Sequence, residues 1–105
     1  MIAQETIRKA IELLKEAANP VKIILFGSYA RGNASKDSDL DFLVVEKELL
    51  SRRMEMVRLR RVLSSLRIPV DIIVVSERIF NEWLTTPGTI IYEAGLEGKI
   101  VYETS

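Results

Sequence analysis

The sequence predicts one α/β domain, with features of the α+β class, built around a small β-sheet. Three apolar, β-branched runs at residues 21–26, 39–46 and 70–75 have the length and composition of buried strands. Segments with apolar residues at three- and four-residue spacing separate these runs, which is typical of amphipathic helices. The 105 residues contain no repeat, low-complexity segment or linker, so we expect residues 1–105 to fold as a single domain.

The first part of the chain predicts a helix, a strand and a short helical turn. The helix ends at Asn19-Pro20, because a proline cannot continue it. A buried strand at residues 21–26 then leads into a Gly-Ser turn, and residues 28–32 are expected to form one helical turn. Residues 33–38 are polar and indicate a loop before the second strand, at residues 39–46. The apolar stripe of the first helix consists of Ile7, Ala10, Ile11, Leu14 and Ala18.

The longest predicted helix covers residues 48–66 and joins the second strand to the third. Pro69 lies just before the third strand, which covers residues 70–75. Ser76 follows that strand and is expected to be the N-cap of another helix, since a serine hydroxyl can accept from a free backbone N–H. The clearest apolar stripe of the long helix consists of Met56, Leu59, Leu63 and Leu66.

The C-terminal part of the chain predicts one more helix and an edge strand. Thr86-Pro87 are expected to be its N-cap and first helical residue, because proline is favoured at that first position. Gly95 and Gly98 are expected to end this helix. The segment KIVYE at residues 99–103 then predicts an edge strand, although the order of the strands does not follow from this pattern alone.

The composition limits the chemistry that the chain can perform. Lys plus Arg and Asp plus Glu each number 15, so nothing in the zero net charge argues for nucleic acid or an anionic membrane as the main partner. The absence of cysteine and histidine excludes thiolate metal sites and the commonest general base. Any metal must therefore be held by oxygen, which favours Mg²⁺, Mn²⁺ or Ca²⁺. No segment approaches the roughly 20 apolar residues of a membrane span, and we expect a cytoplasmic protein.

Three aspartates form the first candidate site. Asp39 and Asp41 are one residue apart in a strand, so their side chains project on one face of the sheet. Asp71 lies inside the third apolar strand, where a charge is costly without a partner, and it can reach the same site if the two strands are neighbours. Three acids at one place suit divalent metal ions. The ordinary alternative is a solvated strand start or turn cap for the pair, and a strand-edge position for Asp71.

A second candidate site follows the first strand. Gly27 allows unusual backbone angles and close approach by a ligand. Ser28 offers a hydroxyl and backbone N–H groups at a helix start, which can bind phosphate oxygens. Arg31 could add a forked, charged donor to the same phosphates. Taken alone, a tight turn with a serine N-cap and an arginine at a helix end explain these residues equally simply.

The long helix and its exit are rich in arginine. Arg53, Arg60 and Arg67 are seven residues apart and so lie along one stripe. This stripe is either a docking face for an acidic partner or RNA, or a solvated helix face, and the second interpretation is the commoner one. The six arginines are Arg52, Arg53, Arg58, Arg60, Arg61 and Arg67.

In combination these motifs are much more specific than each alone. Gly27-Ser28, ten intervening residues, Asp39-x-Asp41 and a third acid at Asp71 resemble the nucleotidyltransferase superfamily related to DNA polymerase β. In detail the chain resembles the minimal nucleotidyltransferase family, called MNT or MntA-like, over nearly its whole length. The resemblance implies a palm-like fold, with a small mixed sheet and helices packed mainly on one face.

The resemblance also implies a role for each motif residue. Gly27 and Ser28 would hold the triphosphate of ATP, and Asp39 and Asp41 would bind one or two Mg²⁺ ions. Asp71 would complete the metal site or act as the base for the attacking hydroxyl. The reaction would transfer AMP from ATP, with pyrophosphate as the leaving group.

The family resemblance implies a partner as well. Larger relatives carry a second domain for the acceptor, which this sequence lacks, so the acceptor surface would come from a partner or from another copy in a homo-oligomer. The family is similar to antitoxins that are paired with a HEPN-type toxin, and some members adenylylate a tyrosine of that toxin. Two alternatives remain open: an antitoxin that neutralises its partner by binding alone, and a small-molecule nucleotidyltransferase that uses a separate acceptor-binding subunit.

Overall fold

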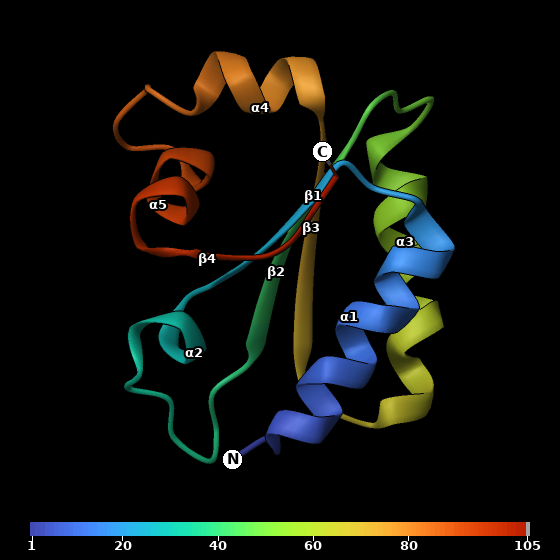
Figure 1. Ribbon diagram of the computed structural model, residues 1–105, viewed down its shortest axis with the longest axis vertical. Helices are drawn as coiled ribbons and strands as arrows, with labels where there is room; N and C mark the ends of the chain where they lie inside the picture. The colour runs from blue at the N-terminus through green and yellow to red at the C-terminus, as the bar shows by residue number, and fades with distance from the viewer. Residues whose placement is uncertain (105) are drawn as a thin grey trace.

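The computed structural model describes residues 1–104 and consists of a four-stranded sheet with helices on both faces (Figure 1). The strands are β1 (Lys22–Phe26), β2 (Leu40–Glu46), β3 (Val70–Ser76) and β4 (Lys99–Glu103). The helices are α1 (Gln4–Ala18), α2 (Ser28–Arg31), α3 (Arg52–Leu63), α4 (Glu77–Trp83) and α5 (Ile90–Glu97), and a 3-10 turn η1 (Ser64–Leu66) extends α3. No helix in this described part of the chain is both long and apolar enough to cross a bilayer.

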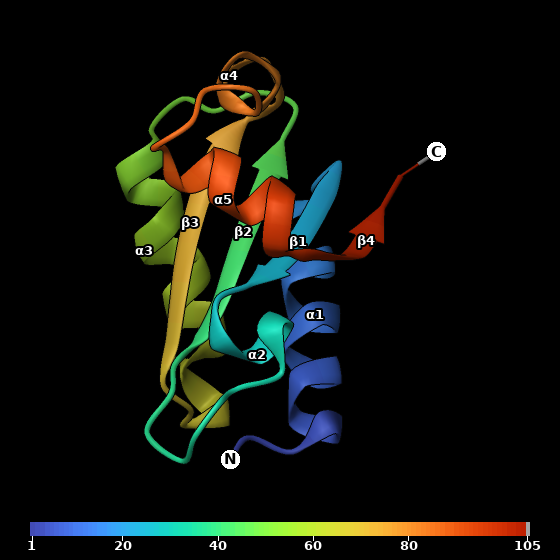
Figure 2. The same ribbon diagram turned by 90° about the vertical axis from the view of Figure 1, so that its left-hand side faces the viewer.

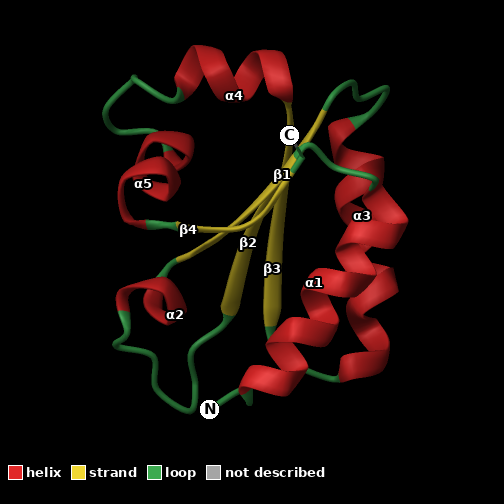
Figure 3. Ribbon diagram, viewed as in Figure 1, coloured by secondary structure: helices red, strands yellow, loops and turns green. Residues whose placement is uncertain are grey.

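The sheet is mixed, as the family resemblance implies, and its strand order is β3-β2-β1-β4. Strand β1 pairs antiparallel with both β2 and β4, whereas β2 and β3 are parallel. Parallel neighbours need a crossover, and α3 provides it by running back along the sheet between β2 and β3 (Figure 3). The prediction of an edge strand at residues 99–103 is confirmed, and β3 forms the opposite edge.

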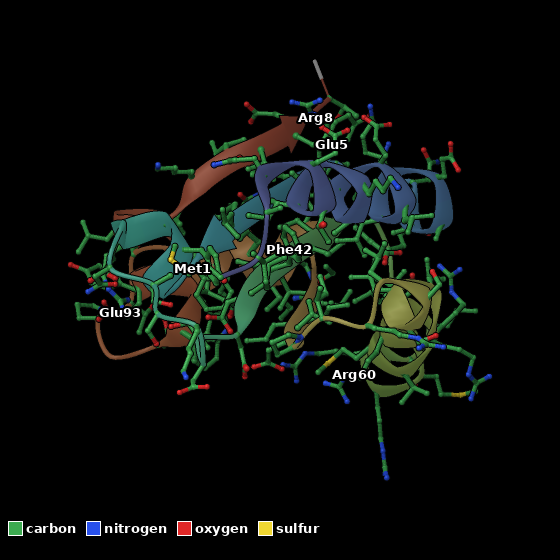
Figure 4. The ribbon with its side chains drawn as sticks, turned by 90° about the horizontal axis from the view of Figure 1, so that it is seen from below. Met1, Glu5, Arg8, Phe42, Arg60 and Glu93 are labelled. Atoms are coloured by element: carbon green, nitrogen blue, oxygen red, sulfur yellow. The ribbon has the colours of Figure 1, made fainter. Side chains whose placement is uncertain are left out.

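The two longest helices, α1 and α3, pack on one face of the sheet (Figures 1 and 2). Their buried side chains Leu14 and Leu63 belong to the same core as Phe42 of β2, which lies near the centre of the molecule in Figure 4. On the other face, α4 and α5 cover a smaller core around Leu43 and Val75. Helices α4 and α5 lie over the C-terminal parts of β2 and β3, so they leave the starts of these two strands uncovered on this face (Figure 2).

The free edge of β3 is partly occupied by α3. The side chain of Arg52, at the start of α3, donates from Nε to the backbone oxygen of Val74 at 2.8 Å. This contact uses a carbonyl that β2 does not pair. The hydrogen bond therefore fixes the start of α3 against β3, the strand that follows this helix in the chain.

Two predicted helix starts are wrong, and capping side chains explain both. Helix α3 begins at Arg52 rather than residue 48, because the Ser51 hydroxyl accepts a hydrogen bond from the Met54 N–H at 3.3 Å. Helix α5 begins at Ile90 rather than at Thr86-Pro87, because Thr89 accepts from the Tyr92 N–H at 3.1 Å.

The predicted end of α5 is half correct. Gly88 has a φ of +89°, which interrupts any helix that started at Pro87. Gly95 lies inside α5, so the prediction that it ends the helix is wrong, whereas Gly98 is the C-cap as predicted. The predicted helical turn after the first strand is confirmed as α2, and Ser76 is confirmed as the N-cap of α4.

Candidate active site

Three carboxylates lie where β2 and β3 begin, on the face of the sheet opposite α1 and α3. Asp41 and Asp71 are direct partners in the parallel pair, so their side chains leave adjacent strands on the same face. Asp39 precedes β2 by one residue and is two positions before Asp41. The alternating apolar residues Leu40 and Phe42 are buried on the other face. Because successive side chains of β2 point to opposite faces of the sheet, the apolar residues enter the core while the aspartates lie on the other face.

This acidic cluster is open to solvent. Asp39 and Asp71 are exposed and Asp41 is half-buried. Further along the same face of β2, Leu43 and Val45 are covered by α4 and α5. The start of this face, with its three carboxylates, therefore remains uncovered by α4 and α5.

The electrostatics of the cluster centre on Asp41. Burial raises the pKa of Asp41 above its ordinary value, and repulsion from Asp71 and then Asp39 raises it further. The nearby charge of Arg31 acts in the opposite direction and does not cancel these effects. The cluster therefore carries negative charge that a bound cation would relieve.

Gly27 brings the turn after β1 against this cluster. Its φ of +75° and ψ of −157° are accessible to glycine and to almost no other residue. A Cβ added at Gly27 would collide with Oδ2 of Asp41. Two separate features thus require glycine at position 27: the backbone conformation and the close approach of the Asp41 carboxylate.

Ser28 is the first residue of α2 and lies next to this contact. The Gly27 oxygen accepts hydrogen bonds from the N–H groups of Ala30 and Arg31, each at 3.1 Å. Within residues 1–104, the Ser28 hydroxyl makes no hydrogen bond to another protein group. The Ser28 hydroxyl is therefore free to donate a hydrogen bond to a negatively charged ligand such as a phosphate.

Arg31 joins α2 to α5. One terminal nitrogen of its guanidinium lies 3.1 Å from Oε2 of Glu97, and both side chains are partly exposed. Glu97 holds Arg31 near the acids, while a guanidinium has five N–H donors and so keeps others for phosphate. The binding of phosphate by Arg31 stays a prediction. Sequence reasoning missed Glu97, and a pair 66 residues apart leaves no local signal.

Arg60 also reaches the acidic cluster. Its guanidinium lies 3.6 Å from Oδ1 of Asp71, and Figure 4 shows Arg60 extending from α3 on this end of the molecule. The sequence places Arg60 on the arginine stripe, for which a solvated helix face is the commoner interpretation. That interpretation did not predict the contact of Arg60 with Asp71. The β2-α3-β3 crossover explains the contact, because it returns the end of α3 to the start of β3.

The cluster fits Mg²⁺ in its donor chemistry. Among residues 1–104, no three acidic side chains are arranged as a ready-made metal cage. Mg²⁺ commonly takes one or two protein carboxylates and completes its shell with water and substrate phosphates. Asp39 and Asp41 provide such a partial set, and the raised pKa of Asp41 indicates unrelieved negative charge. The residues therefore suit Mg²⁺ that arrives together with a nucleotide.

The chain is similar to known proteins over most of its length. The family model described as "Nucleotidyltransferase domain" matches residues 7–95. A relative from Methanocaldococcus jannaschii, named "putative protein adenylyltransferase", is 32% identical over 85 residues, which cover 72% of this chain and 84% of the relative. Two further relatives of that organism, with the same name, match this chain over only 24% and 59% of their own lengths.

Solved structures have the same fold. One described as a "putative minimal nucleotidyltransferase" is 31% identical, with a TM-score of 0.61 and coverage of 93% of this chain and 95% of that one. Another belongs to a complex of a tri-AMPylated Shewanella oneidensis HEPN toxin with an MNT antitoxin. That likeness, at 24% identity, a TM-score of 0.61 and coverage of 96% of this chain and 72% of that one, concerns the fold alone.

Proposed function

Because the chain belongs to the nucleotidyltransferase domain family, we propose that it transfers AMP from ATP to a tyrosine hydroxyl of a partner protein, with Mg²⁺ as its cofactor. The observation that carries this proposal is the pairing of Asp41 with Asp71 across β2 and β3, directly beside the Gly27 turn. The relatives named as protein adenylyltransferases support a protein acceptor over a small molecule.

Each group of the cluster has a task in this reaction. Asp39 and Asp41 would hold Mg²⁺, and Asp71 would complete the metal site or take the proton of the attacking hydroxyl. When bound, Mg²⁺ would neutralise the charge that develops as pyrophosphate leaves. Ser28 would bind phosphate oxygens, and Gly27 lets the turn that carries Ser28 approach Asp41 closely. The acceptor oxygen forms a bond to the α-phosphorus while the bond from that phosphorus to pyrophosphate breaks.

The biological role that we propose is that of an antitoxin in a pair with a HEPN-type toxin. The AMPylated toxin in the similar complex supports this role, since it combines the transferred group with a partner protein. Transfer of AMP adds a bulky, charged group to the partner and would inactivate it if the modified tyrosine lies near its active site.

The test uses ATP labelled at the α-phosphate in one reaction and at the γ-phosphate in another. The purified protein is incubated with Mg²⁺ and an extract of its source cells. We expect a protein band that is labelled from the α position alone, and Asp41→Asn should abolish it. Label from the γ position would instead indicate a kinase. No label from either position would favour an antitoxin that acts by binding alone.

A further inference from the structure

Helix α3 presents an apolar surface to solvent on the side that does not face the sheet. Leu50 is fully exposed, and the exposed fractions of Met54 and Val57 are 73% and 47%. Met54 and Val57, three positions apart, lie on one side of the helix, and Leu50 lies in the segment just before it and lines the same groove. They line a groove of about 960 Å³ whose floor includes Glu46 and Glu55.

The core does not need this surface. Helix α3 packs on the sheet through Leu59 and Leu63, which point the opposite way and are buried. A single exposed apolar residue is ordinary, but a contiguous apolar patch with a polar rim marks an interaction site. The outer side of α3 is therefore a second apolar stripe on one short helix.

Three arginines and three glutamates line the groove. Arg53 and Arg61 line it, and within residues 1–104 neither forms an ion pair with an acidic side chain. Arg58, also on the rim, is neutralised by Glu55 at 2.8 Å. Two unneutralised arginines beside an apolar stripe complement a partner that carries carboxylates next to apolar side chains.

A protein helix matches this surface better than RNA does. No aromatic residue lines the groove, so bases would have no ring on which to stack. An amphipathic helix can place apolar side chains in such a groove and keep its own charges at the rim.

The surface also leads to the candidate active site. Helix α3 runs back along the sheet from the end of β2 to the start of β3, and Arg60 near its end contacts Asp71. A partner helix that lies along α3 thus extends toward the acidic cluster. The acidic cluster lies on the other face of the sheet, so a docked acceptor would have to reach it around the β3 edge, where Arg60 meets Asp71.

We propose that the outer face of α3 (Arg53, Met54, Val57 and Arg61), together with Leu50 just before the helix, is the docking surface for an acidic amphipathic helix of the acceptor protein. The identity of the docked protein as the acceptor rests on the proposed function. The binding chemistry of the surface does not, because it follows from the exposed stripe and its arginines.

The probe is a synthetic, fluorescently labelled helical peptide of about 14 residues, long enough to lie along α3 at ~1.5 Å per residue. One version carries leucines on one face and glutamates beside them, and the control version carries lysines in place of the glutamates. Fluorescence anisotropy with the whole protein should show saturable binding of the glutamate peptide alone. Arg53→Glu and Met54→Glu should each weaken binding about tenfold or more, as expected for central interface residues.

The controls separate docking from catalysis and from general charge effects. Arg78→Glu, on α4, reverses an equally exposed helical arginine and should leave peptide binding unchanged. Asp41→Asn should lose AMP transfer but retain peptide binding, whereas Arg53→Glu should lose peptide binding but retain binding of an ATP analogue. If transfer fails in the wild type while the peptide still binds, the proposed function falls and the docking surface stands.

Three results would overturn the docking proposal. These are no saturable binding of the glutamate peptide, equal binding of the lysine peptide, or an equal loss of binding in Arg78→Glu and Arg53→Glu. Single-stranded RNA or phosphatidylserine vesicles are tested in the same assay. Binding of either that depends on Arg53, without binding of the glutamate peptide, would assign the surface to that ligand instead.

Discussion

Strand β2 carries a carboxyl group near each end, and the two are in opposite situations. Glu46, at the end of the strand, is buried against α3, and burial raises its pKa to about 8, reinforced by the hydrogen bond to Glu55 and repulsion from it. Arg58 lies beside this pair and neutralises Glu55. Asp41, near the start, is half-buried on the other face and is crowded by two more acids.

The difference separates a carboxyl whose charge the protein relieves from one whose charge it leaves unrelieved. At Glu46 the raised pKa favours the neutral, protonated carboxyl, and the neighbouring Glu55 is paired with Arg58. At Asp41 the two neighbouring carboxylates add to the charge, and Arg31 offsets it only in part. A cluster that the fold leaves unneutralised is one that a ligand is able to stabilise.

The largest expected effect comes from the charge of Asp41. Asp41→Asn should lower the rate of AMP transfer about 100-fold or more, because metal stabilisation of transferring phosphate is worth several kcal/mol. The stability of the fold should not decrease, since the substitution removes repulsion from Asp39 and Asp71. Initial rates with α-labelled ATP and thermal melts measure both. The matched control is Glu46→Gln, which should keep transfer; loss of transfer in a folded Glu46→Gln protein would contradict the division of roles.

The second effect concerns the glycine that touches Asp41. Gly27→Ala should lower the free energy of unfolding by roughly 2–4 kcal/mol, since it adds a collision to a backbone conformation that only glycine adopts easily. Gly32→Ala is the control, because Gly32 has a φ of +80° but no atom within 4 Å of an added Cβ. It should cost only about 1 kcal/mol. Equal losses in urea unfolding would show that contact with Asp41 is unimportant.

The third effect is the pH dependence that Glu46 introduces. Its pKa in the folded protein, about 8, lies above the ordinary value of 4.5, so the folded state holds a proton that the unfolded state releases in this window. The free energy of unfolding should therefore fall as the pH rises from about 5 to 8, by roughly 3–4 kcal/mol. Glu46→Gln should flatten this decrease in urea unfolding curves. A slope that persists in Glu46→Gln would assign the effect to another group.

Glu55 acts in the opposite direction and in a different window. The hydrogen bond from Arg58 lowers the pKa of Glu55 to about 2, so its contribution to stability is lost only as the pH falls below 4.5. Measurements above pH 5 therefore exclude the effect of Glu55, and the comparison with Glu46→Gln separates Glu46 from Asp41, whose pKa is also raised.

The smallest expected effect concerns Arg60, which competes with a metal for Asp71. Arg60→Gln should raise the affinity for Mn²⁺, a substitute for Mg²⁺, about two- to fivefold, because exposed ion pairs contribute about 0.2–1 kcal/mol. Titration followed by electron paramagnetic resonance measures this affinity without any reaction. Arg78→Gln is the control for the loss of one positive charge. An unchanged or lower affinity in Arg60→Gln would place Asp71 outside the metal site.

The strands and their faces could be predicted from the sequence almost to the residue. The runs at 21–26, 39–46 and 70–75 correspond to β1, β2 and β3 within one residue at each end, because their β-branched composition and turn boundaries are local signals. Helix starts were less predictable. Thr86 and Thr89 can both serve as caps, and the choice depends on the conformation of Gly88 between them.

The site could be predicted only as far as its motif reaches. Asp39, Asp41 and Gly27 are close in the chain, whereas Asp71 could be placed with them only on the condition that the second and third strands are neighbours, which the parallel pairing of β2 and β3 meets. The contacts of Arg60 with Asp71 and of Arg31 with Glu97 depend on how α3 and α5 pack, which no local pattern encodes. The roles of these residues in catalysis stay predictions until the substitutions are made.

The position of β3 at the edge of the sheet has a consequence for solubility. An apolar edge strand with unpaired backbone groups is a template on which other chains can add as strands and aggregate. Here the start of the edge carries the charge of Asp71 after Pro69, and further along Arg52 occupies the carbonyl of Val74. Asp71→Val would thus remove a charge that disfavours aggregation through the β3 edge, and with it a candidate catalytic acid. One carboxylate would then have two separate reasons to be kept at this position.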